Sequence, residues 1–219
     1  NMGNDDISYN VAVGYNAMGN STYGLRNVAV GYNALDANTS GNDNTAIGQE
    51  TLSTNQTGRQ NVAVGRAALN TATGDNNTAV GYHALINNTT AEENTAVGAF
   101  ALADNTTGTR NTAVGLYASI SNTTGNDNTA VGRSALQNNT TGYDNVAVGR
   151  NSLDANTTGY QHVAIGESAL TSNTTGYRNT AVGQGAMAAC STGVENTALG
   201  QNAANDITTG TLGAVTLGT

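Results

Sequence analysis

Apolar residues recur along this 219-residue chain at fixed intervals, in a pentad that reads N-[TV]-A-[VIL]-G. The pentad occurs 12 times, with His162 replacing the first Asn once, and the step is 17 residues except for one of 16 between Asn61 and Asn77. The complete unit is N-T-A-V-G-x-x-A-L-x-x-N-T-T-G-x-x, whose repeat positions we number one to seventeen. Such a period indicates one stacked structural unit rather than several domains.

Each unit is too short for the paired helices of helical repeats, which need about 33 residues. β-Branched residues at positions two and four favour a short strand, N-T-T-G is typical of a turn, and the Gly of position five indicates a corner. We therefore predict an all-β protein, a parallel β-solenoid (a β-roll or β-helix) of about 12 coils with two short strands in each. At about 4.8 Å per coil, this predicts a rod of roughly 58 Å.

The repeat also divides the chain. Residues 1–9 are interpreted as a lead-in from a preceding segment, residues 10–210 as the solenoid shaft, and residues 211–219 as a cap or the start of a following module. The first ten residues lack the basic-then-apolar pattern of a signal peptide. The apolar ending "TLGAVTLGT" favours a fragment of a longer fibre.

Alternation along a strand sends positions two and four to one side and position three to the other. The larger residues of position four are the predicted coil core: Val13, Val30, Ile47, Val64, Val80, Val97, Val114, Val131, Val148, Ile165, Val182 and Leu199. The alanines of position three would then face outward and form an interface with other copies: Ala12, Ala29, Ala46, Ala63, Ala79, Ala96, Ala113, Ala130, Ala147, Ala164, Ala181 and Ala198. Adjacent apolar pairs such as Ala34 and Leu35 also suggest a second apolar face, so we expect a parallel homo-oligomer.

The pentads "NVAVG" (27–31), "NTAIG" (44–48) and "HVAIG" (162–166) resemble the S-V-A-I-G motif of trimeric autotransporter adhesin heads, which are trimers of left-handed parallel β-rolls. The longer unit "NTAVGYHALINNTT" (77–90) is similar to repeats in phage tail-fibre and fibre-like bacterial proteins. The resemblance covers residues 10 to 210 and implies a homotrimer, intertwined or side by side. Because the adhesin-head unit is shorter than this one, coil shape and handedness do not follow from it.

The composition and net charge narrow the classes of partner that the protein could bind. The net charge of −8, with no lysine among the basic residues, argues against a nucleic-acid partner, since a phosphate backbone requires a basic surface. No run of 18 apolar residues is present, so we predict no membrane insertion. The single Cys190 excludes an internal disulfide framework.

Two columns of side chains follow from the repeat. Tyr143, Tyr160 and Tyr177 share position sixteen in successive coils, and such a column either contacts a cell-surface glycan or only stiffens the rod; the second interpretation is favoured. A ladder of amides is predicted at position twelve, from Asn105, Asn122, Asn139, Asn156 and Asn173. Arg66, Arg133 and Arg150 share position six and are interpreted as ordinary surface arginines.

The sequence gives no support for a catalytic site or a metal site. His83 and His162 stand alone at different repeat positions, and no nucleophile–base pair or paired-carboxylate site is recognisable, so we predict no enzyme and no cofactor. Asn42, Asp43, Asn126 and Asp127 could offer oxygens to calcium, but solvated corners explain them better. Copy seven, "GLYASI" (115–120), breaks the pattern with Ser119 at the leucine position, which we interpret as a local adjustment.

These features favour an extracellular structural segment of a phage tail fibre or phage-like bacterial appendage, located on a virion or cell surface. The rigid shaft would present or contribute to host attachment. One alternative is an adhesin head that binds glycan or matrix protein directly. A minor alternative is an ice-binding solenoid, which the adjacent threonines of N-T-T-G disfavour, because neighbours in a strand point to opposite faces.

Overall fold

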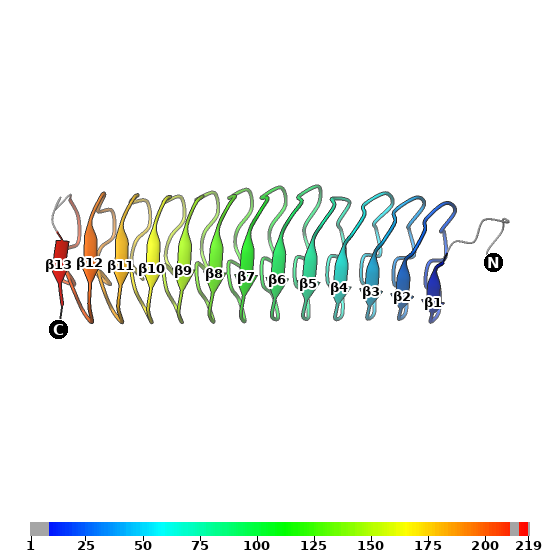
Figure 1. Cartoon of the computed structure of the whole chain (residues 1–219), viewed down its shortest axis with the longest axis horizontal. Coiled ribbons are helices and arrows are strands. Elements are labelled where there is room, and N and C mark those ends of the chain that lie inside the picture. Colours follow the sequence, from blue (N-terminus) through cyan, green and yellow to red (C-terminus); the bar gives the residue numbers. More distant parts are fainter. Residues whose placement is uncertain (1–8, 211–214, 219) are drawn as a thin grey trace.

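Stacked coils form an elongated rod with the first and last strands of the chain at opposite ends (Figure 1). The structure is a computed structural model that describes residues 9–210 and 215–218. Most of the predicted lead-in (1–9) and part of the predicted cap (211–219) lie outside the described residues. The strands are β1 (Val11–Val13), β2 (Val28–Val30), β3 (Thr45–Ile47), β4 (Val62–Val64), β5 (Thr78–Val80), β6 (Thr95–Val97), β7 (Thr112–Val114), β8 (Thr129–Val131), β9 (Val146–Val148), β10 (Val163–Ile165), β11 (Thr180–Val182), β12 (Thr197–Leu199) and β13 (Val215–Leu217).

The strands make one parallel sheet of 13 strands in chain order, which confirms the predicted β-solenoid. Pairing follows the repeat position by position, as in Ala113 with Ala130. The 16-residue unit keeps this register, because Val62 still pairs with Thr78. Since every strand pairs with its repeat equivalent, differences in unit length are taken up in the turns.

Within the described residues each repeat contains one three-residue strand, not two. The remainder of the coil still bonds to the next coil through its backbone, for example from Leu136 N to Ser152 O at 2.9 Å. An extended second strand is interrupted because repeat positions seven, nine and seventeen take positive φ, such as 57° at Ser134, 53° at Leu136 and 56° at Asp144. The predicted second strand is therefore replaced by a hydrogen-bonded turn.

The solenoid interior is lined by the small residues, so the predicted directions of positions three and four were wrong. The alanines assigned to an oligomer interface are buried inside their own chain from the second coil on: Ala29, Ala46, Ala63, Ala79, Ala96, Ala113, Ala130, Ala147, Ala164, Ala181 and Ala198. Ala12, in the first coil, is exposed. None of the residues assigned to the core is buried; these are Val13, Val30, Ile47, Val64, Val80, Val97, Val114, Val131, Val148, Ile165, Val182 and Leu199.

The bulk of the core comes instead from position nine. Leucines there are fully buried, and so are the alanines beside them at position eight, such as Ala135 next to Leu136. Both neighbours face inward because the left-handed backbone at position nine (φ 53° at Leu136) breaks the alternation of a strand. With leucine already filling the interior, only a methyl group fits opposite it at position three.

The glycine of position five is required by two features of the corner. Gly132 has a φ of 136°, which side chains rarely allow, and an added Cβ would lie 2.6 Å from the carbonyl oxygen of Gly149 in the next coil. The same close approach to the next coil's backbone recurs from Gly14 to Gly183. Glycine at this position therefore sets how closely consecutive coils stack.

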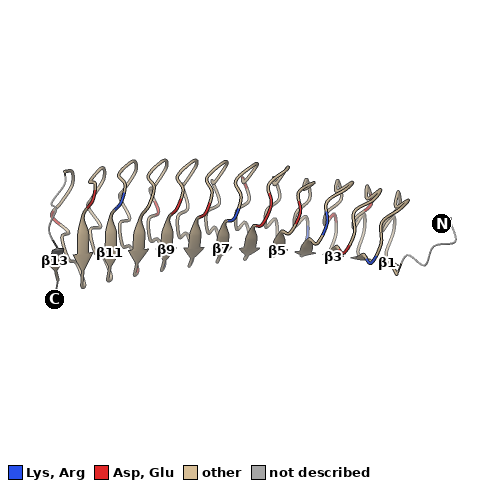
Figure 2. Ribbon diagram, turned by 45° about the horizontal axis from the view of Figure 1, so that its top comes forward, with Lys and Arg blue, Asp and Glu red and all other residues tan. Residues whose placement is uncertain are grey.

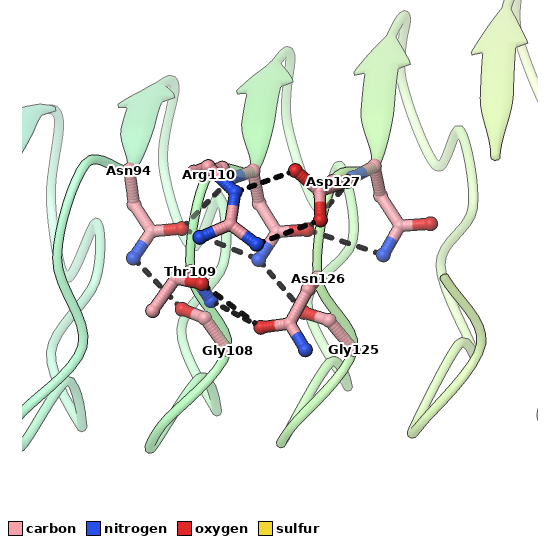
Figure 3. A network of polar contacts seen from close by, with 9 residues as sticks. Asn94, Gly108, Thr109, Arg110, Gly125, Asn126 and Asp127 are labelled. Carbon is pink, nitrogen blue, oxygen red and sulfur yellow. Dashed lines mark hydrogen bonds and ion pairs between the residues drawn. The ribbon is translucent and has the colours of Figure 1, made fainter. Parts of the chain in front are cut away.

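Two ladders of buried asparagines run through the described solenoid. The predicted one at position twelve is confirmed from Asn105 to Asn156, since Asn122 Nδ2 donates to Asn105 Oδ1 and Asn139 Nδ2 to Asn122 Oδ1, both at 2.8 Å. Asn173, its last predicted member, does not join the ladder, because Asn156 Oδ1 accepts no hydrogen bond from it. Ala72 and Cys190 stand at this position in coils four and eleven. The sequence interpretation missed the ladder at position one, where Asn94 Nδ2 donates to the Gly108 carbonyl at 2.9 Å (Figure 3) and Asn94 Oδ1 accepts from the backbone N of Asn111.

Candidate functional site

The outer face of the sheet is an apolar stripe that runs along the rod. It consists of repeat positions two and four of β1 to β12, which are Val or Thr and Val, Ile or Leu, respectively. Eight of the position-four side chains are exposed, from 36% at Val114 to 57% at Val13, and the other four, Val30, Val64, Val148 and Val182, are partly buried. The sheet contains no charged side chain, and the charged residues lie on the connecting turns (Figure 2).

This stripe is about as large as the largest apolar patch that a monomeric protein usually exposes. Two columns about 7 Å apart over roughly 58 Å cover on the order of 400 Å². The largest apolar patch of a protein is often a contact surface, and this one is free of charge and continues along the whole described sheet. The stripe is therefore the candidate assembly surface, in place of the buried alanines.

The charged and amide side chains of the corner at positions sixteen and seventeen bond from coil to coil. Arg110 forms a two-pronged ion pair with Asp127, and the Thr109 N–H donates to Asn126 Oδ1 at 2.7 Å (Figure 3). Arg26 and Asp43 make the same pair, and Asn42 Oδ1 accepts from Leu25 N. The oxygens considered for calcium are thus engaged with neighbouring coils, and among the described residues no group of three or more His, Cys, Asp and Glu could hold a metal ion.

The predicted column of Tyr143, Tyr160 and Tyr177 is present. Its rings stack with centroids 4.9 and 5.0 Å apart and planes within 5° of parallel, and Arg178 lies 5.8 Å from the centroid of Tyr177. Both faces of Tyr160 are therefore covered by tyrosines, and what the column offers to solvent is mainly ring edges. This geometry favours the stiffening ladder over stacking of sugar rings, and glycan contact at this column stays a prediction.

His162 is the one titratable residue in the position-one ladder of the described chain, and it is fully buried. Its Nδ1 accepts from the Asn179 N–H at 3.2 Å, so Nε2 carries the proton and donates to the Gly176 carbonyl at 2.9 Å. Burial lowers the pKa of His162 to about 4. The neutral imidazole thus replaces an asparagine amide with one donor and one acceptor.

We expect His162 to make the solenoid acid-sensitive between about pH 6.5 and pH 4. In this window the unfolded chain binds a proton that the folded chain, with a pKa of about 4, does not. The free energy of unfolding therefore falls as the pH drops and levels off below pH 4, by on the order of 3 kcal/mol in total. Urea unfolding of the parent and of His162→Asn should show a difference that opens below pH 6.5; parallel pH curves would contradict it.

Known proteins offer no guide to this site. No protein-family model matches the chain, and no similar curated protein or solved structure was found. Within the described part of the chain, no helix has the length and apolar character needed to cross a membrane.

Proposed function

We propose that the chain is a structural segment of an extracellular fibre, of the phage tail-fibre or phage-like bacterial appendage kind, in which copies assemble along the apolar stripe. The observation that carries this proposal is the charge-free outer face of the sheet, which continues along the rod. Burying it in a parallel bundle removes apolar surface from water at every coil. A homotrimer is the arrangement that the resemblance to fibre repeats implies.

A stiff shaft suits the internal bonding of the rod. Every coil is tied to the next by the sheet and by the buried position-one ladder, whose hydrogen bonds are stronger in the protein interior than in water. Such a shaft would hold an attachment module away from the surface that carries it. Direct binding by an adhesin head is less favoured at the tyrosine column, because its ring faces stack on one another.

The solution mass tests the proposal. Light scattering should give a multiple of 22.0 kDa for the parent, near threefold for a trimer, and a mass near the single chain for Val114→Glu/Val131→Glu, because four charges per pair of facing copies would be buried. Thr124→Glu/Thr141→Glu places the same charges on exposed turn residues of the same two coils and should leave the mass unchanged. A parent that is a folded monomer at all concentrations would rule out assembly along the stripe.

That monomer outcome would favour ice binding instead. Positions two and four present parallel columns of Thr and Val, such as Thr112 and Val114, repeated at about 4.8 Å on the outer face. The threonines of N-T-T-G are not part of this array. Their hydroxyls at position thirteen donate to the backbone of the next coil, as the Thr106 hydroxyl does to the Thr123 carbonyl. Thermal hysteresis in the parent that is lost in the Val114→Glu/Val131→Glu variant would support this function.

A further inference from the structure

Coils five to seven, which begin at Asn77, Asn94 and Asn111, carry a surface cluster of side chains that the other described coils do not repeat. Position seven is His83, Phe100 and Tyr117 in these coils, whereas elsewhere it holds Asn, Glu, Ala, Ser or Gly. Tyr82 and Leu116 at position six complete the cluster, and we call these five residues the aromatic patch. Tyr82, Leu116 and Tyr117 are 40%, 39% and 39% exposed, and the other two are half-buried.

The rings of the aromatic patch do not form a closed stack like the tyrosine column. Phe100 lies at 79° to His83 and at 31° to Tyr117, with centroids 5.4 and 5.6 Å apart. Only Tyr82 and His83 are parallel. Because an edge-on ring covers less of its neighbour's face than a parallel one, these rings cover one another less completely than those of the tyrosine column.

Coil seven departs from the residue pattern of the other coils. Its outward residues Leu116 and Tyr117 are apolar, while Ser119 takes the inward leucine position and is buried. The Ser119 hydroxyl has no hydrogen-bond partner among the residues that the structure describes. A coil that exposes a leucine and a tyrosine ring and buries an unpaired hydroxyl is not optimised for stability, and such exceptions concentrate at functional sites.

Two arginines bracket the aromatic patch. Arg66 and Arg133 occupy position six in coils four and eight, four coil steps or about 19 Å apart along the axis. The Arg66 guanidinium lies 5.9 Å from the centroid of the Tyr82 ring. Arg26, Arg110, Arg150 and Arg178 each pair with a carboxylate, but in the described chain Arg66 and Arg133 have no such partner.

From this arrangement we propose that the aromatic patch, with Arg66 and Arg133, binds a polysaccharide that carries carboxylated sugars and lies along the rod. Sugar rings would pack their C–H faces on Phe100 and Tyr117, while a carboxylate at either end accepts from a guanidinium, whose planar fork matches it. Single-stranded nucleic acid also combines rings and anions, but it carries a phosphate at every residue, and two arginines on a chain of net charge −8 compensate too few of them. The site does not depend on assembly along the apolar stripe.

The experiment uses an array of oligosaccharides that contain uronate or sialate residues, each printed beside its carboxyl-reduced form. The parent should bind at least one carboxylated member and at least tenfold less of its reduced form. Phe100→Ser/Tyr117→Ser and Arg66→Gln/Arg133→Gln should each weaken that binding at least tenfold. Ser and Gln already occupy these repeat positions at Ser134, Ser168 and Gln184, so the coils can hold them.

Controls separate the patch from general charge and aromatic effects. Arg59→Gln removes an arginine outside the patch and Tyr143→Thr removes an outer tyrosine, and neither should change binding. The proposal is overturned if no carboxylated member binds, if the reduced forms bind equally, or if a single-stranded oligonucleotide binds more tightly at the same sites. It is also overturned if the Phe100→Ser/Tyr117→Ser variant keeps full binding or instead loses the oligomeric mass of the parent, since the patch would then be a contact between copies.

Discussion

Replacing Asn128 with alanine is expected to lower the thermal midpoint of the solenoid by on the order of 10 °C. Its Nδ2 donates to Asn111 Oδ1 at 3.1 Å and to the Gly142 carbonyl at 2.9 Å, and its Oδ1 accepts from the N–H and Nδ2 of Asn145, both at 3.1 Å. The alanine variant leaves several of these buried partners unpaired, at about 1–3 kcal/mol each. A loss of about 3–6 kcal/mol corresponds to this shift for a chain of this length.

Two other variants define how specific this effect is. Asn128→His copies His162 and keeps one donor and one acceptor, so at neutral pH it should cost less than alanine. Asn126→Thr copies Thr109 at the partly exposed position sixteen and should move the midpoint by only a few degrees. Circular dichroism melting curves provide the measurement. If the alanine variant had the same thermal midpoint as the Asn126→Thr control, the position-one ladder would contribute little to stability.

The Ala130→Glu variant is expected not to fold, whereas Val131→Glu, one residue later, should fold normally. Ala130 lies between Ala113 and Ala147 in the sheet and is buried within its own chain, so a carboxylate there has neither space nor a partner. Val131 is 37% exposed on the outer face. Burial of an unpaired charge costs more than about 4 kcal/mol, an exceptional effect for one substitution.

Soluble yield and far-ultraviolet circular dichroism distinguish the two variants. Ala130→Ser is the matched mild change, since a hydroxyl adds little volume, and it should fold with a lowered midpoint. If Ala130→Glu were folded but reduced to a single-chain mass, the alanines would form the contact between copies after all. The pair therefore tests the inward direction of position three independently of how many chains assemble.

The sequence predicts the features that depend on the period. The parallel sheet, the amide ladder at position twelve and the parallel tyrosine column follow because equivalent residues must lie above one another when identical units stack. The stacking of Tyr160 on Tyr177 needs only their spacing of 17 residues. The register survives the 16-residue unit for the same reason, since pairing of Val62 with Thr78 satisfies the strands on both sides.

Features that depend on whether a side chain faces the interior or the solvent were not predictable by the same reasoning. Strand alternation shows that Ala130 and Val131 face opposite ways but not which of them faces inward, and the larger residue was assigned to the core. The actual direction depends on Leu136, whose positive φ turns it inward beside Ala135. The unbroken use of a methyl-sized residue at position three was the available signal, because a confined interior limits size more strictly than an exposed stripe does.

The apolar stripe and the aromatic patch were missed in part for a related reason. Once Val114 was placed inside, the outer face of the sheet could not be recognised as apolar. The aromatic patch lies at repeat positions that vary freely, so Phe100 stands out only when it is compared with His83 and Tyr117 at the same position of the neighbouring coils. Aligning the 12 copies and comparing position seven alone would have located this patch.

The equivalence of the coils also determines how such a chain changes length in evolution. Each internal coil presents an equivalent strand, the same corner glycine and, except for His162, the same asparagine to the coil before it and the coil after it. Unequal recombination between repeats in the gene would therefore add or remove a whole coil without creating a new junction in the protein. The length of the solenoid can thus be adjusted in increments of about 4.8 Å, while coils with distinctive side chains, such as those of the aromatic patch, would be moved intact along the rod.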